Sequence, residues 1–215
     1  ETNVPEHLRS SDNTWFALSK RARIVAISKD RVTRDEIKRI EDLQDVKWRG
    51  RICSRPGSHV YNRSLLASII VANGAEKAST WAKGLVANLA RRPQGNDRAQ
   101  IKAIHSGECD VALVNHYYYG KLLFSNVADQ RTWAKSVNLI FTNQGDRGNH
   151  VNISGGGVVK YSKNKENAIR LLEFLTEQTA QRLYGEINFE YPVNPAVAIG
   201  KELRSWGDFK EDKIE

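Results

Sequence analysis

Short apolar runs alternate with longer segments of helical periodicity along most of this 215-residue chain, and this alternation constrains the fold more than any other feature. Short continuous apolar runs are typical of strands buried inside a sheet. Such runs predict strands at residues 23–28, 51–53, 110–114, 137–141 and around 158–159. Apolar residues spaced three and four apart predict helices at residues 33–43, 61–71, 76–90, 98–106, 117–124 and 167–184, the last being the longest. The alternation predicts an α/β protein with a mostly parallel sheet.

Capping residues and glycines mark several ends of these segments. Thr33, with Glu36 three residues later, predicts a capped helix start, and Asn96 with Asp97 forms a second capping pair. The glycines at 155–157 lack the neighbours of a phosphate-binding loop. We therefore expect close backbone packing at a turn there.

Composition and motifs argue against several classes of protein. No stretch approaches the roughly 18 to 20 apolar residues that a membrane-spanning helix needs, so we expect no direct membrane insertion. The net charge of +8 is scattered, with its densest patch at residues 20–23, and no nucleic-acid-binding motif accompanies it. Neither a GxSxG element nor a Ser-His-Asp order indicates a hydrolase. We expect neither a nucleic-acid partner nor an enzyme.

The sequence contains no methionine and begins with a polar segment. We therefore expect that Glu1 is not a translational start, and that either a leader has been removed or the sequence is a fragment. The beginning of the sequence leaves the cellular compartment open.

The two cysteines, Cys53 and Cys109, lack the CxxC spacing of zinc and thioredoxin-type sites. Both stand at the entrance to strand-like runs. If those strands are neighbours in a parallel sheet, the two sulfurs come close enough for a disulfide, which suits an oxidising compartment. Two buried free thiols are the alternative, and the residues alone leave both open.

The segment NHYYYG at residues 115–120 is the most unusual feature, because consecutive side chains on a strand point to opposite faces. It lies where a predicted strand turns into a helix, at the strand end where open α/β sheets bind ligands. At such a junction two successive phenols can point into one cleft. Phenolates suit a hard, highly charged cation such as Fe3+, whereas softer or divalent metals call for clusters that are missing here. Aromatic packing is the commoner explanation of such a pair taken alone.

Several segments together resemble a known family, the ferric-iron solute-binding proteins of bacterial ABC importers, particularly the cyanobacterial-type branch. These segments are WFALSKRARIVAIS at 15–28, RPGSHVYNRSLLASII at 55–70, RPQGNDRAQIKAIHSGECDVALVNHYYYGKL at 92–122, NISGGGVVKYSKNKENAIRLLEFL at 152–175 and EYPVNPAV at 190–197. The resemblance covers nearly the whole chain. It implies a monomeric periplasmic protein with a two-lobed type II periplasmic-binding fold, which closes on Fe3+ and delivers it to an inner-membrane ABC permease.

The resemblance also implies a set of site residues. The N-x-Y-Y element makes Tyr117 and Tyr118 paired iron ligands and leaves Tyr119 as a packing residue, while Tyr61 of the HVYNRS segment is the third ligand. Arg21 resembles an arginine that some members place beside the metal or its accompanying anion, such as carbonate or citrate. Asn115 and Ser58 are weaker candidates for supporting positions. Without the resemblance, Tyr61 would be interpreted as a helix-start residue and Arg21 as a surface cation.

Family members carry an additional N-terminal portion, so we expect one lobe to be incomplete here. We expect residues 1–22 to be a remnant of the N-lobe, 23–143 the C-lobe that carries the tyrosines, 144–190 a return segment to the N-lobe, and 191–215 a tail packing on the C-lobe.

Two alternatives to iron capture stay open at this point. A protein of the same fold could bind an organic or anionic solute, such as a polyamine, thiamine or a phosphate ester, through carboxylates or aromatic stacking. A basic nucleic-acid-binding module is the alternative from another class, and it would show salt-dependent retention on DNA.

Overall fold

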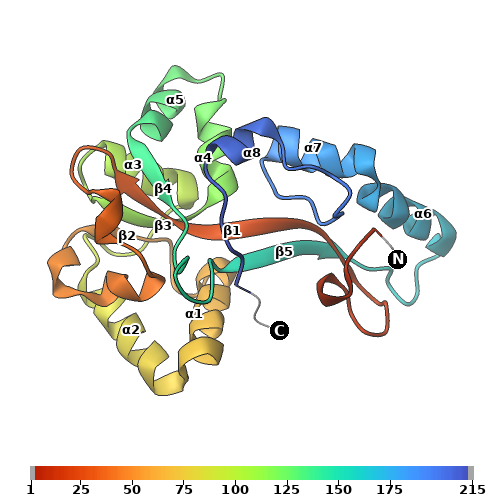
Figure 1. The fold of residues 1–215 in the computed structure, drawn as a ribbon, viewed down its shortest axis with the longest axis horizontal. Helices are drawn as coiled ribbons and strands as arrows, with labels where there is room; N and C mark the ends of the chain where they lie inside the picture. Colours follow the sequence, from red (N-terminus) through yellow and green to blue (C-terminus); the bar gives the residue numbers. More distant parts are fainter. Residues whose placement is uncertain (1–2, 213–215) are drawn as a thin grey trace. The chain divides into compact units, whose positions relative to one another are not determined.

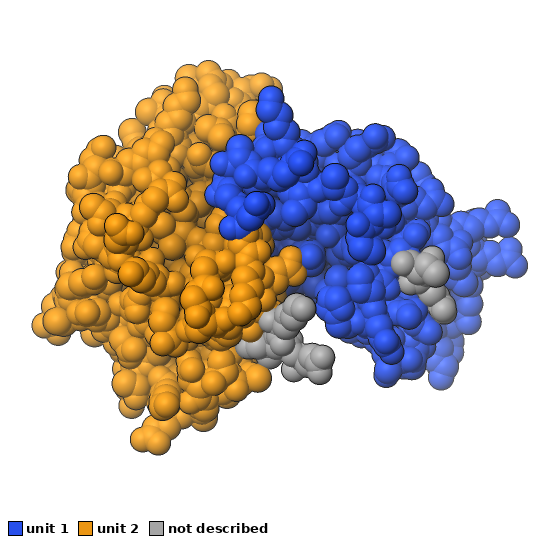
Figure 2. Space-filling model, in the orientation of Figure 1, with its two compact units in different colours: residues 1–21, 152–208, 215 blue, residues 22–151, 209–214 orange. Residues whose placement is uncertain are grey.

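A computed structural model describes residues 3–212 (Figure 1). The chain divides into two compact units (Figure 2). Unit 1 comprises the residues up to Arg21 together with Asn152–Asp208, and unit 2 comprises Ala22–Val151 with the short stretch that begins at Phe209. The first boundary falls inside strand β1 (Phe16–Ser28) and the second inside strand β5 (Val151–Gly156), which pairs with β1.

The sheet of unit 2 has the strand order β2-β3-β1-β4, with β2 at Ile52–Cys53, β3 at Val111–Asn115 and β4 at Val137–Ile140. β2 runs parallel to β3, whereas β1 runs antiparallel to both β3 and β4. Along the β1–β3 ladder, Ile27 faces Val111 and Arg23 faces Asn115. The predicted α/β architecture is confirmed. The predicted parallel arrangement holds for β2, β3 and β4, which run in the same direction, but not for β1. A run of buried apolar residues indicates that a strand is buried but does not indicate its direction in the sheet.

Five α-helices cover this sheet: α1 (Val60–Asn73), α2 (Ala75–Ala87), α3 (Asp97–His105), α4 (His116–Leu123) and α5 (Ala128–Lys135). In Figure 1, α1 and α2 lie below the strands, and α3, α4 and α5 lie above them. α3 begins because the side chain of Asn96 accepts a hydrogen bond from the backbone N–H of Ala99 at 3.1 Å. Gly74, with a φ of 85°, allows the sharp turn from α1 into α2.

The helix predicted at residues 33–43 is replaced by short 3-10 turns, namely Arg34–Glu36, Ile40–Gln44 and Val46–Trp48. The predicted cap is present, since the backbone N–H of Thr33 donates to Glu36 at 2.9 Å. A second cap follows too soon for one continuous helix. The carboxylate of Asp42 accepts from the backbone N–H groups of Lys38 and Arg39 at 2.9 and 2.8 Å, and this starts a new turn.

The core of unit 2 lies between the sheet and the α1–α2 pair. Its members include Val25, Ile27, Trp48, Ile52, Leu65, Ile69, Trp81 and Leu113. The indole N–H of Trp81 donates to the carbonyl oxygen of Ile40 at 3.0 Å, so the 3-10 turns are anchored to α2. This core holds the helix that carries Tyr61 against the sheet.

Unit 1 contains the first part of β1, β5, a 3-10 turn (Glu6–Leu8) and helices α6 (Lys165–Thr176), α7 (Gln178–Asn188) and α8 (Lys201–Ser205). The single helix predicted at 167–184 is wrong, because Glu177 adopts an extended conformation that separates α6 from α7. The predicted strand at 158–159 lies earlier, in β5. Close backbone packing at the glycines is confirmed, but the predicted turn is wrong, because Gly155 and Gly156 lie in strand β5. A Cβ atom on Gly155 would lie 2.7 Å from the carbonyl oxygen of Phe16, within the pairing of β5 with β1.

Residues 191–208 group with unit 1, and the short stretch from Phe209 groups with unit 2. Gln181 of α7 holds the first part of this segment in unit 1. Its amide oxygen accepts from the backbone N–H groups of Val193 and Asn194 at 2.7 and 3.2 Å, while its amide nitrogen donates to Leu18. The outer ends of the predicted segments, residues 1–2 and 213–215, lie outside the described residues.

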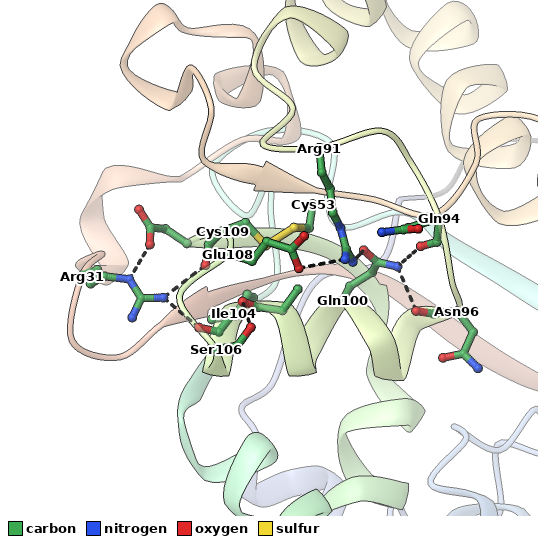
Figure 3. Close-up of a disulfide and its surroundings, with 12 residues drawn as sticks. Arg31, Cys53, Arg91, Gln94, Asn96, Gln100, Ile104, Ser106, Glu108 and Cys109 are labelled. Carbon is green, nitrogen blue, oxygen red and sulfur yellow. Dashed lines mark hydrogen bonds and ion pairs between the residues drawn. A yellow bond between two sulfur atoms is a disulfide. The ribbon is translucent and has the colours of Figure 1, made fainter.

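A disulfide joins Cys53 in β2 to Cys109, which lies two residues before the start of β3 (Figure 3). The Cα atoms of the two cysteines are 5.9 Å apart, and β2 and β3 are parallel neighbours, as this pairing requires. None of the helices within residues 3–212 is both long and apolar enough to cross a membrane.

Candidate metal centre

The three predicted ligands, Tyr61, Tyr117 and Tyr118, all lie in unit 2, each in the first turn of a helix. α1 follows the loop after β2, and α4 follows β3 without a break. Because β2 and β3 are parallel, their carboxyl ends lie at the same edge of the sheet, so both helices begin there. The start of α1 is fixed by His59, whose Nδ1 atom accepts from the backbone N–H of Tyr61 at 3.3 Å.

The phenol groups of these tyrosines lie close together. The hydroxyl oxygens of Tyr61 and Tyr117 are 3.0 Å apart, within hydrogen-bond distance, and the ring centres of Tyr117 and Tyr118 are 4.4 Å apart. Burial raises the pKa of Tyr117 above that of a free phenol, and hydrogen bonds to Tyr118 and Tyr61 raise it further. Burial also raises the pKa of Tyr118. Without a bound cation the phenols of Tyr117 and Tyr118 therefore keep their protons at neutral pH, and Tyr117 is within hydrogen-bond distance of Tyr61.

Cationic side chains contact the faces of the tyrosine rings. The guanidinium carbon of Arg55 lies 4.9 Å from the ring centre of Tyr61, and that of Arg98 lies 5.6 Å from the ring centre of Tyr118. The Nζ atom of Lys121 is 5.5 Å from the ring centre of Tyr117. Positive charge at these distances favours negative charge on the phenol oxygens, and therefore favours phenolates bound to a metal.

A buried ion-pair group lies beside Tyr61 and consists of Arg23, Asp97 and Arg55; we call it the inner charge cluster. The Asp97 carboxylate accepts from Arg23 at 3.1 Å and from Arg55 at 3.3 Å. The guanidinium carbon of Arg23 is 5.8 Å from the ring centre of Tyr61. The side chains of Arg23 and Asp97 are 2% and 0% exposed, so the pair is shielded from water.

Asn115, Ser58 and Arg21 take different positions. Asn115 is buried, and its side-chain oxygen accepts from Arg23 at 3.2 Å, which connects it to the inner charge cluster. Ser58 is exposed in the loop before α1. Arg21 belongs to unit 1, where its guanidinium donates to the carbonyl oxygen of Ile153. Tyr119 is half-buried, and burial raises its pKa.

The histidines next to the tyrosines orient the backbone. His59 caps α1, and its ring lies 4.5 Å from that of Tyr61. His116 is fully buried, and its Nδ1 atom lies 3.1 Å from the backbone nitrogen of Ala22 in β1. These contacts hold the starts of α1 and α4 in place.

Within residues 3–212, no group of three or more His, Cys, Asp or Glu side chains could hold a metal ion. The three phenols are hard oxygen donors and suit a trivalent cation such as Fe3+. Sequence reasoning missed the inner charge cluster, together with Asn62, Arg98 and Lys121. The visible signal was Arg23, a charged residue at the first position of the strand predicted at residues 23–28.

The sequence matches the family described as bacterial extracellular solute-binding protein over residues 2–210. The chain is 49% identical over 212 residues to iron uptake protein A1 of Synechocystis sp., which covers 99% of this chain and 59% of that protein. It is 30% identical over 184 residues to the major ferric iron-binding protein of Neisseria meningitidis serogroup B, which covers 85% of this chain and 54% of that protein. The chain therefore spans a little over half the length of these curated relatives.

Solved structures resemble the chain over almost its whole length. A ferric binding protein from Campylobacter jejuni superposes with a TM-score of 0.95 at 39% identity, covering 98% of this chain and 67% of that one. A Trichodesmium protein in complex with iron and citrate superposes with a TM-score of 0.92 at 47% identity, covering 97% of this chain and 66% of that one.

Proposed function

Because the chain belongs to the family of bacterial extracellular solute-binding proteins, we propose that it captures ferric iron for an ABC importer and delivers it to the membrane permease. Relatives of this chain are named for iron uptake and ferric iron binding. The observation that carries the proposal is the 3.0 Å separation of the Tyr61 and Tyr117 hydroxyl oxygens. In this function the protein acts in the periplasm as a monomer, without nucleic acid and without catalysing a reaction.

In the proposed mechanism, Tyr61, Tyr117 and Tyr118 bind Fe3+ as phenolates. The ion displaces the phenol protons, because a trivalent cation stabilises the phenolate far more than a proton does at neutral pH. Water, an anion such as carbonate or citrate, or a further protein ligand completes the coordination. Arg21 is proposed to lie near the metal or its anion, and Asn115 and Ser58 are proposed to support the ligands.

The units take the roles of two lobes in this proposal. Unit 2 is the lobe that carries the tyrosines, and unit 1 is the part of the opposite lobe that this chain contains. The disulfide within unit 2 agrees with an oxidising compartment such as the periplasm.

The decisive experiment is a titration of the protein, expressed from its whole gene, with ferric citrate. We expect a visible phenolate-to-iron charge-transfer band, which Tyr117→Phe removes or strongly weakens. Tyr119→Phe is the matched control, because it changes an adjacent tyrosine that is not a proposed ligand, and it should leave the band intact. A colourless ferric complex, or a band that survives Tyr117→Phe unchanged, would overturn the proposed site.

Iron affinity should also depend steeply on pH. Each phenol that must lose a proton strengthens apparent binding about tenfold per pH unit as the pH rises, until that phenol is ionised. The raised pKa of Tyr117 keeps its phenol protonated throughout the neutral range. Competition with citrate at pH 6 and pH 8 measures this dependence. Equal affinity at both pH values would show that phenolates are not the ligands.

An anionic solute is the second candidate, because arginine and lysine side chains surround the three phenols. The same positive charge disfavours a polyamine. Isothermal titration with a phosphate ester, thiamine and ferric citrate would separate these cargoes. Binding of the phosphate ester in the absence of iron would favour the second candidate.

A further inference from the structure

Both helices that carry the proposed ligands are tied to one buried guanidinium group. Arg23 donates to the side-chain oxygen of Asn62 at 2.6 Å and to that of Asn115 at 3.2 Å. Asn62 directly follows Tyr61 in α1, and Asn115 stands two residues before Tyr117 at the start of α4. Arg23 therefore bridges the two ligand-bearing helices through residues adjacent to the ligands.

Asp97 holds this guanidinium in place. One of its carboxylate oxygens accepts from Arg23 at 3.1 Å and from the backbone N–H of Asn115 at 2.9 Å, and the other accepts from Arg55 at 3.3 Å. The Asp97 side chain is completely buried, so water does not compete for these bonds. Charged hydrogen bonds in such surroundings are strong and restrict the geometry of their partners.

The loop before α1 is fastened to the same group. The amide nitrogen of Asn62 donates to the Ser54 hydroxyl at 3.0 Å and to the carbonyl oxygen of Arg55 at 2.9 Å. This places the Arg55 guanidinium against the ring of Tyr61. The Tyr61 ring is thus restrained by contacts from both arginines of the inner charge cluster.

Building on the proposed function, we propose that the inner charge cluster positions the ligands: it fixes α1 against α4 so that the phenol oxygens of Tyr61 and Tyr117 stay together. Arg23 and Asp97 then set how tightly the metal is held without coordinating it. Residues that orient metal ligands in other proteins typically change metal affinity by about 10- to 100-fold when they are replaced.

The test compares two double variants of the protein expressed from its whole gene. Arg23→Gln with Asp97→Asn removes both charges of the inner pair and keeps a polar amide at each position. The control, Arg31→Gln with Asp110→Asn, makes the same changes in another arginine–aspartate pair of unit 2. Arg31 of this pair also donates to the carbonyl oxygen of Cys109, next to the disulfide (Figure 3). The measurements are circular dichroism, the charge-transfer spectrum of the ferric complex, and the rate of iron release to a competing chelator.

We expect the inner double variant to fold, to show a shifted charge-transfer band, and to release iron at least about tenfold faster than the unchanged protein. The control should match the unchanged protein in both iron measurements. Arg23→Lys, made alone, keeps the charge but lacks the planar fork that reaches two asparagines. This variant should therefore still release iron faster than the unchanged protein.

The outcomes separate this inference from the proposed function. If the unchanged protein forms no charge-transfer band with ferric citrate, the proposed function fails, and this inference fails with it. If it forms the band and the folded inner variant has the same band and release rate, only this inference is overturned. An Arg23→Lys variant that releases iron at the rate of the unchanged protein would also overturn it. If the inner variant does not fold, Asn62→Ala decides: it breaks the bridge to α1 with all charges intact, and an unchanged release rate would reject the inference.

Discussion

Two clusters of the same composition, two arginines around one aspartate, lie at opposite ends of β3. The inner charge cluster contacts Asn115, the last residue of the strand. The second, which we call the outer charge cluster, consists of Arg31, Asp110 and Arg51 and adjoins the first residue. Five residue steps separate Asp110 from Asn115, roughly 16 Å along a strand.

The difference between the clusters is their burial. The side chains of Arg23, Asp97 and Arg55 are 2%, 0% and 11% exposed, whereas those of Arg31, Asp110 and Arg51 are 38%, 16% and 33% exposed. Water screens the outer cluster, so its contribution to stability is modest. The inner cluster is shielded from water and relies on the ion pairs among its members and on hydrogen bonds to Asn62 and Asn115, so the loss of one member leaves a buried charge that water cannot solvate. The same three residue types therefore restrain the geometry of their neighbours more strongly in the buried cluster than in the exposed one.

The largest expected difference concerns removal of the aspartates. Asp97→Leu leaves two guanidiniums buried without their carboxylate and should lower the free energy of unfolding by about 3 to 5 kcal/mol. Asp110→Leu should cost only about 1 kcal/mol, since its arginine partners reach water. Urea unfolding monitored by circular dichroism measures both. Equal losses would mean that burial does not distinguish the clusters.

The disulfide beside the outer charge cluster should matter for stability but not for iron. Removing it with Cys53→Ala and Cys109→Ala should lower the free energy of unfolding by about 2 to 4 kcal/mol, because the denatured chain loses a crosslink. The tyrosines lie at the other end of β3, so the charge-transfer band should be preserved. A disulfide-free protein that folds but has lost the band would contradict this separation.

The outer charge cluster should also respond to acid. Burial opposes ionisation of Asp110, but hydrogen bonds from Arg31 and Arg51 prevail and lower its pKa below the ordinary value near 4. Its stabilising effect is therefore fully present above about pH 4 and is lost as the pH falls through the lowered pKa. A double-mutant cycle between Arg51 and Asp110 should give a coupling free energy of about 0.5 to 1 kcal/mol at pH 7 and a smaller one at pH 2. A coupling free energy that is larger at pH 2 than at pH 7 would contradict the lowered pKa of Asp110.

An effect as small as that coupling is expected from an exposed cation over a ligand ring. Arg98→Gln removes the guanidinium near Tyr118 and should weaken iron binding by only about 0.5 to 1 kcal/mol, a factor of a few. Lys102→Gln is a matched control on the same helix, since Lys102 lies over Trp133, which is not a proposed ligand. Competition with citrate measures both, and a loss at Lys102 as large as at Arg98 would rule out a specific effect of the cation at Tyr118.

Much of the fold could be predicted from the sequence because burial leaves a pattern. The buried runs of β3 and β4 and the amphipathic faces of α1 and α2 were all identified. The interruptions of the helices predicted at 33–43 and 167–184 were not identified. Each depends on local hydrogen bonds or on the backbone conformation of one residue, as at Asp42 and Glu177. α5 was also missed, since among its residues only Ala134 is buried and no apolar stripe is visible.

The candidate site was only half predictable. Three tyrosines in a row cannot be explained by a regular strand, and the family resemblance added Tyr61. The inner charge cluster left little trace, because Asp97 looks like an ordinary acidic residue at a helix start and Arg55 like an ordinary loop residue. Their role depends on burial against segments distant in sequence, which no local pattern encodes.

The pairing of Arg23 with Asn115 in the β1–β3 ladder has a consequence for folding accuracy. Residues 24–27 are buried on both faces of the sheet, so their side chains would tolerate a slip of one position along the ladder. Such a slip would turn Arg23 towards the opposite face, away from Asp97, and leave its guanidinium in hydrocarbon. Arg23 thus fixes the register of a strand whose apolar residues alone would leave it ambiguous. A chain that pairs β1 with β3 in the wrong register is destabilised before it binds any cargo.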